Sequence, residues 1–180
     1  MSIKSIGFIP VMVSAHPTEL ALAMDRLQNE HDLFRDRLKV LEVQAKQVNM
    51  LDDIDKGIQV LTYLRQQTIQ LVDELDVHAD WEQKQLFPFL DHYFHHQHLP
   101  SILPSFWVLE KDHELAQSFI QSFMEAVDRL QVKPIKEGII EAAANLIQAC
   151  LILNDHITME EHLVFPLTEQ VLTDLDHFFS

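Results

Sequence analysis

Glycine and cysteine are both scarce in this chain, which has 3 glycines and 1 cysteine among 180 residues. So few glycines, together with few segments that alternate apolar and polar residues, argue against a sheet protein and favour helices. The single cysteine excludes an internal disulfide, and we therefore expect a reducing, cytoplasmic setting. Because the neighbours of Cys150 are apolar, we expect a buried core thiol rather than a reactive one.

Basic residues are also few, with 13 Lys and Arg against 28 Asp and Glu, for a net charge of −15. This balance argues against nucleic acid as a partner, because phosphates require basic patches, and against anionic membrane surfaces. No apolar stretch is long enough to span a membrane. The apolar segment 6–13 is short and contains Pro10, so we interpret it as part of an extended arm rather than a signal peptide.

The length fits one domain, and we expect an N-terminal arm over residues 1–17 and a helical bundle over residues 18–180. Apolar residues recur at helical spacing over about 18–48, 58–87, 105–132 and 134–165. Pro88 and Pro166 each remove a backbone donor, so we expect breaks near Phe87 and Phe165, each followed by a short extra helix. The predicted fold class is all-α, an up-down-up-down four-helix bundle.

One short pattern occurs twice in the expected second and fourth helices. His78 is followed four residues later by Glu82, His156 is followed four residues later by Glu160, and a Phe-Pro pair begins five residues after each glutamate. Residues i and i+4 share a helix face, so each copy directs an imidazole and a carboxylate at one point. Two such helices facing each other would surround a metal ion with nitrogen and oxygen donors, which suit iron, manganese or zinc.

Two further histidines fall at the same level of the expected bundle. In an antiparallel hairpin, residues at one level are equidistant from the turn. The midpoint of His31 and His78 lies in the acidic turn near residues 52–57, and the midpoint of His113 and His156 lies at Pro134. Shared between two metal ions, these donors leave a coordination position for a small ligand. The six candidate metal ligands are His31, His78, Glu82, His113, His156 and Glu160.

The set of motifs resembles the hemerythrin-like, HHE cation-binding family over about residues 18–167. The resemblance implies a four-helix bundle with two iron ions, bridged by two carboxylates and an oxo or hydroxo group, with zinc or manganese as substitutes. Members of that family bind O2, sense O2 or NO, or repair damaged iron centres under nitrosative stress. The motifs that carry the resemblance are Glu30-His31, His78-x-x-x-Glu82, Asp112-His113 and His156-x-x-x-Glu160.

The sequence departs from the oxygen-carrying branch of that family at two places. Those proteins have a second histidine four residues after the third-helix ligand, where this chain has Gln117. They also place the last carboxylate five residues after histidine, which here is Glu161. The internal repeat favours Glu160 instead, and the two glutamates remain alternatives. The missing imidazole favours the sensory and stress-response members over reversible O2 carriage.

Two other patterns in the sequence offer alternative metal sites. Ferritin-like di-iron oxidases carry Glu-x-x-His on two helices, and only Glu110-x-x-His113 fits that spacing here, so we do not favour that class. The histidines at 92, 95, 96 and 98 lack carboxylates at matched spacing, and we expect a solvated connection there. Acceptors for the outer N–H of the ligating imidazoles are expected, and the sequence neighbours Asp32, Asp112 and Asp155 are candidates.

The sequence therefore predicts a non-haem di-iron binding protein, rather than an enzyme, that binds O2 or NO for sensing, buffering, or iron and stress handling. One alternative is a stress enzyme that repairs iron centres or reduces NO or peroxide. A second alternative is a metal-stabilised interaction module. A homodimer is one candidate assembly.

Overall fold

The computed structural model describes residues 17–96 and 103–179, and within these ranges its only regular structure is helical. The predicted arm lies outside the described residues except for Pro17. The elements in chain order are α1 (Pro17–Val48), α2 (Ile54–Trp81), the π-helical segment η1 (Glu82–Leu86), α3 (Phe87–His96), α4 (Leu103–Val132) and α5 (Lys136–Phe179).

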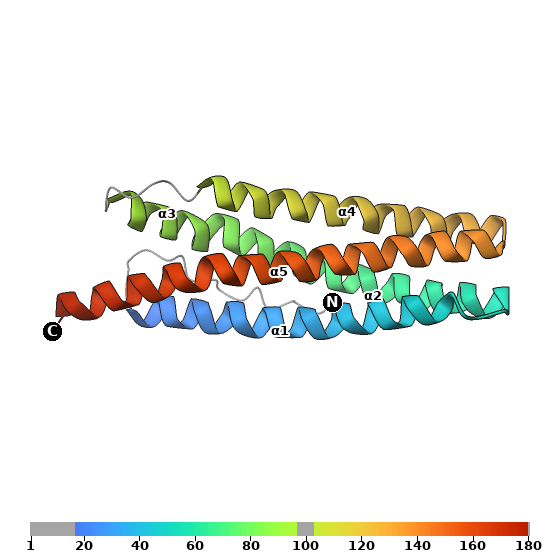
Figure 1. Ribbon diagram of the computed structural model, residues 1–180, viewed down its shortest axis with the longest axis horizontal. Helices are drawn as coiled ribbons and strands as arrows, with labels where there is room; N and C mark the ends of the chain where they lie inside the picture. The colour runs from blue at the N-terminus through green and yellow to red at the C-terminus, as the bar shows by residue number, and fades with distance from the viewer. Residues whose placement is uncertain (1–16, 97–102, 180) are drawn as a thin grey trace, which may run out of the picture.

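Four long helices lie side by side along the long axis of the molecule, with the α1–α2 and α4–α5 turns at the same end (Figure 1). Helix α1 packs on α2 and α5, and α4 packs on the same two helices. The prediction of an all-helical bundle is confirmed. Asp53 caps α2 by accepting a hydrogen bond from the backbone N–H of Lys56 at 3.1 Å. Lys136 connects the two turns, because its Nζ donates to the carbonyl oxygens of Asn49 and Leu51.

The apolar core is divided into two clusters by a layer of polar residues. The larger cluster, on the side of the two turns, includes Phe34, Phe123 and Ile157. The smaller one includes Leu27 and Val164. Along the helices, His31, His78 and Glu160 lie where the chain passes from one cluster to the other, and apolar packing therefore shields them on both sides. Cys150 is buried in the larger cluster, as predicted, and burial raises the pKa of its thiol to about 12.

The expected break near Phe87 is present as a local change of helix type. In η1 the backbone hydrogen bonds join residues five apart instead of four. The backbone N–H of Phe87, for example, donates to the carbonyl oxygen of Glu82. Pro88 then falls in the first turn of α3, directly after the π-helical segment, where a proline is better tolerated than in a helix interior. The π-helical turn begins at one of the candidate ligands, Glu82.

The expected break at Pro166 was wrong. Helix α5 continues from Lys136 through Pro166 to Phe179. A proline inside a helix costs about 3 kcal/mol, but the residues around it, Val164, Thr168 and Val171, are buried against the other helices. Tertiary packing of this face therefore offsets the local preference for a break.

The two prolines are consequently expected to respond differently to substitution. Alanine at Pro166 restores a helical hydrogen bond and should raise the free energy of unfolding by about 1–3 kcal/mol. Alanine at Pro88 should change it by less than about 0.5 kcal/mol, because a first-turn proline is already tolerated. Urea denaturation of the two variants in metal-free buffer measures the difference. Equal effects would contradict the uninterrupted α5.

Candidate metal centre

Four buried side chains from four helical elements form a compact cluster of potential ligand atoms. His31 comes from α1, His78 from α2, Glu82 from η1 and Glu160 from α5, and one ligand atom of each lies within 4.8 Å of all the others. The two Nε2 atoms of His31 and His78 are 3.2 Å apart. Glu160 Oε2 lies 3.3 Å from His31 Nε2, and Glu82 Oε1 lies 2.6 Å from His78 Nε2.

The other two predicted ligands adjoin this cluster. His156 Nε2 lies 3.7 Å from Glu160 Oε2, so Glu160 stands between His31 and His156. The rings of His113 and His156 pack with their centroids 4.0 Å apart. The structure thus brings all six residues into one contiguous group, with His113 on α4 at its edge.

The donor set fits a metal ion because several of its buried polar atoms have no partner within the described residues. Both carboxylate oxygens of Glu160 and both ring nitrogens of His156 are buried without a hydrogen bond. A buried, unpaired polar atom ordinarily costs about 1–3 kcal/mol. Lone pairs of carboxylate and imidazole that converge without donors are instead what a divalent cation requires.

A carboxylate and an arginine hold the outer nitrogen of His78. His78 Nδ1 donates to Glu30 Oε2 at 2.7 Å, and Arg26 Nε donates to the other oxygen of Glu30 at 2.8 Å. The Arg26 guanidinium also lies 4.2 Å from the centre of the Trp81 ring. A hydrogen on Nδ1 leaves Nε2 facing the cluster, which fixes the orientation a metal-binding imidazole needs.

A carboxylate on α5 and an arginine on α1 hold the outer nitrogen of His31 in the same way. Its Nδ1 donates to Glu161 Oε1 at 3.1 Å, and Arg35 donates to both oxygens of Glu161 at 2.7 Å. Glu160 and Glu161 therefore occupy different places: the first lies inside the cluster and the second outside it.

The predicted outer acceptors were wrong where the structure tests them. Asp32 is 63% exposed and lies 3.9 Å from Arg35, while Glu161 holds His31. Asp112 Oδ2 and both nitrogens of His156 are without hydrogen bonds, so neither Asp112 Oδ2 nor Asp155 accepts from a ligand imidazole. Adjacent helical residues point in different directions, which is why sequence neighbours fail as partners. Matching of levels across the α1–α2 hairpin, applied to Glu30 and His78, could have found one of the true pairs.

The acidic surroundings and the burial act in opposite directions on the imidazoles. Burial opposes a charged His78, but hydrogen bonds to Glu30 and Glu82 outweigh it and raise its pKa to about 10. Burial and the charge of His113 lower the pKa of His156 to about 3. Burial, reinforced by the charge of Glu160, raises the pKa of Glu82 well above its usual value. The carboxylates thus draw a proton onto His78, at the point where a metal ion would supply positive charge.

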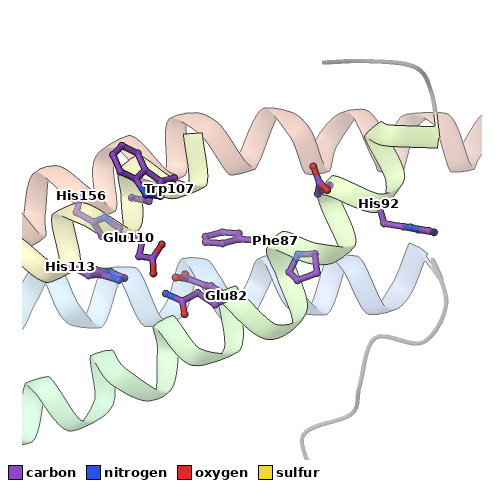
Figure 2. Close-up of a pocket in the computed structure, with 11 residues that line it drawn as sticks. Glu82, Phe87, His92, Trp107, Glu110, His113 and His156 are labelled. Atoms are coloured by element: carbon purple, nitrogen blue, oxygen red, sulfur yellow. The ribbon is translucent and has the colours of Figure 1, made fainter. Parts of the chain in front are cut away.

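A cavity of about 570 Å³ opens onto one side of the group. His113 and His156 line one wall and Glu82 faces them, with Phe87 and Trp107 nearby (Figure 2). His31, His78 and Glu160 do not line it. The cavity therefore gives access from the side of His113 and His156. His92, predicted to lie in a solvated connection, belongs to α3 and lines the outer part of this cavity.

A family model described as the hemerythrin HHE cation binding domain matches residues 22–168. The chain belongs to this family. The resemblance inferred from the repeated motif is confirmed, and the matched region includes all six candidate ligands. No curated protein and no solved structure shows significant similarity to the chain. The hemerythrin HHE assignment and the buried His/Glu cluster together support metal-cation binding.

Within residues 17–96 and 103–179, no helix is long and apolar enough to cross a membrane.

Proposed function

We propose that this hemerythrin HHE domain holds two iron ions in an up-down-up-down bundle and binds O2 or NO for sensing, buffering, or iron and stress handling. The observation that carries the proposal is the convergence of unpaired carboxylate and imidazole atoms in a buried layer. The six proposed ligands are His31, His78, Glu82, His113, His156 and Glu160.

The distances support a division of the ligands between two ions. His31 and His78, with adjacent Nε2 atoms, would hold one ion, and the stacked pair His113 and His156 would hold the other. Glu160 lies near both His31 and His156, which suits a bridging carboxylate. Such an iron pair would supply electrons for reversible redox change and an open position for a diatomic ligand.

The surrounding residues would orient the centre and control access to it. Glu30 with Arg26, and Glu161 with Arg35, fix His78 and His31 in their orientations. Phe87 and Trp107 give the cavity an apolar wall, which favours entry of a small uncharged ligand over bulk water.

The direct test is metal content and an optical spectrum of protein produced with iron and without a histidine tag, because the chain already contains 11 histidines. About two irons per chain, with near-ultraviolet absorption that changes on exposure of the ferrous protein to O2 or NO, is the expected result. An iron-loaded protein whose spectrum responds to neither gas would exclude the proposed function. One tightly bound zinc ion without redox chemistry would favour the metal-stabilised interaction module.

Iron-centre repair is the second candidate, and the asymmetry of the site favours it. Hydrogen bonds to Glu161 and Glu30 hold His31 and His78, whereas His156 has no such bond in the described chain and lies on the open cavity. An ion on that side would exchange more readily. Incubating iron-loaded protein with a metal-free iron–sulfur protein would show transfer of about one iron per chain if this role holds.

A further inference from the structure

The cavity next to His113 and His156 is lined by a set of side chains that suits a cation. Three carboxylates and three imidazoles line it, and neither lysine nor arginine is among its lining residues. Among the lining residues, His156 has both ring nitrogens buried without hydrogen-bond partners in the described chain. The proposed ligands account for Glu82, His113 and His156, but a further carboxylate, Glu110, also lines the cavity.

Glu110 reaches the cavity from α4, one turn before His113. Figure 2 shows its carboxylate directed between the two histidines on one side and Glu82 on the other. Residues three apart lie on the same helix face. A glutamate and a histidine at this spacing can bind the same ion, as in di-iron carboxylate bundles.

Two nearby exposed acidic residues pair with lysines, whereas no hydrogen bond or ion pair is found for Glu110 within the described chain. Asp80 pairs with Lys84, and Glu114 pairs with Lys111 at 2.6 Å. Gln117, which stands where oxygen carriers have a second histidine, is directed toward Asp76 on α2 at 3.5 Å. In α4, the turn after His113 therefore offers no direct replacement for the missing imidazole. The turn before His113 offers the carboxylate of Glu110.

We propose that Glu110 is a seventh ligand, which binds the metal ion held by His113 and His156. The inference rests on the proposed metal centre and adds a donor that the repeated motif does not contain. With one more oxygen donor, this position would favour harder ions than the His31–His78 position does.

The test compares equilibrium binding of cobalt(II) to the wild type, Glu110→Gln and the matched control Glu114→Gln, with His113→Ala as a reference that weakens the second site. Cobalt(II) is suitable because its absorption reports coordination and needs no activity. The wild type and Glu114→Gln should bind two ions alike. Glu110→Gln should bind the first ion unchanged and the second about 10- to 100-fold more weakly. Circular dichroism of the metal-free variants checks that each is folded.

A second variant separates coordination from simple attraction by charge. Glu110→His removes the negative charge but supplies a ligand atom, so it should retain the second ion better than Glu110→Gln. Equal losses in these two variants, or equal binding by Glu110→Gln and wild type, would overturn the inference while leaving the metal centre intact. A wild type that binds fewer than two ions would overturn the proposed metal centre itself.

Discussion

Glutamine in place of Glu160 is expected to abolish binding of both metal ions, whereas glutamine in place of the next residue, Glu161, should leave two ions bound. Glu160 is fully buried between His31 and His156, and a neutral amide there would remove both the negative charge and one oxygen of the proposed bridging carboxylate. Glu161 contacts His31 only at its outer nitrogen. Its loss frees the ring to rotate and should weaken affinity about 10- to 100-fold without changing stoichiometry.

Metal content after dialysis, followed by titration with iron(II) under argon, distinguishes the two variants. The adjacent positions control for any general effect of removing one negative charge from this part of α5. If Glu161→Gln lost both ions and Glu160→Gln kept them, the roles assigned to the two glutamates would be reversed, and the spacing of the oxygen-carrying branch would apply here after all.

Phenylalanine in place of His156 is expected to give a protein that is more stable than the wild type without metal and less stable than the wild type with metal. Both nitrogens of His156 are buried without partners, so the metal-free variant loses an unfavourable desolvation and should be more stable by about 1 kcal/mol or more. The adjacent cavity gives the larger ring room. For a domain of this size, 1 kcal/mol corresponds to roughly 2–4 °C in Tm.

With metal present, the wild type should be the more stable protein. A ligand at about a thousand times its Kd adds about 4 kcal/mol to the free energy of unfolding, and the variant lacks a ligand for one of the two ions. Thermal melts with excess iron(II) and with a chelator show which protein, wild type or variant, has the higher Tm in each condition. His162→Phe, at an exposed position on the same helix, is the control and should show no reversal. A His156→Phe protein that is less stable than wild type under both conditions would contradict a site built for metal.

The candidate metal ligands could be predicted from the sequence because their spacing follows the period of the helix. The two copies of His-x-x-x-Glu fix which residues share a helix face, and the distances from the turns fix which helices meet at one level. Neither inference depends on side-chain packing. The candidate ligands His31, His78, Glu82 and Glu160 converge for this reason.

The features that sequence reasoning missed depend on packing between helices that are distant in sequence. Arg35 and Glu161 meet across α1 and α5, and no local pattern encodes that contact. The same limit explains the error at Pro166, where local chemistry predicts a break and burial of the surrounding face determines the continuous helix. Pro88 looked equivalent in sequence, but a π-helical turn precedes it.

The polar layer that divides the core has a consequence for the cooperativity of unfolding. Apolar contacts on the two sides of the layer are largely separate, so the metal-free chain contains two units that need not open together. Ions bound in the layer would join α1, α2, α4 and α5 across that boundary. We expect amide hydrogens around Leu27, Leu90 and Val171 to exchange by partial opening without metal, and only by global unfolding once metal is bound. The centre would then act as a switch between local and global unfolding as well as a binding site.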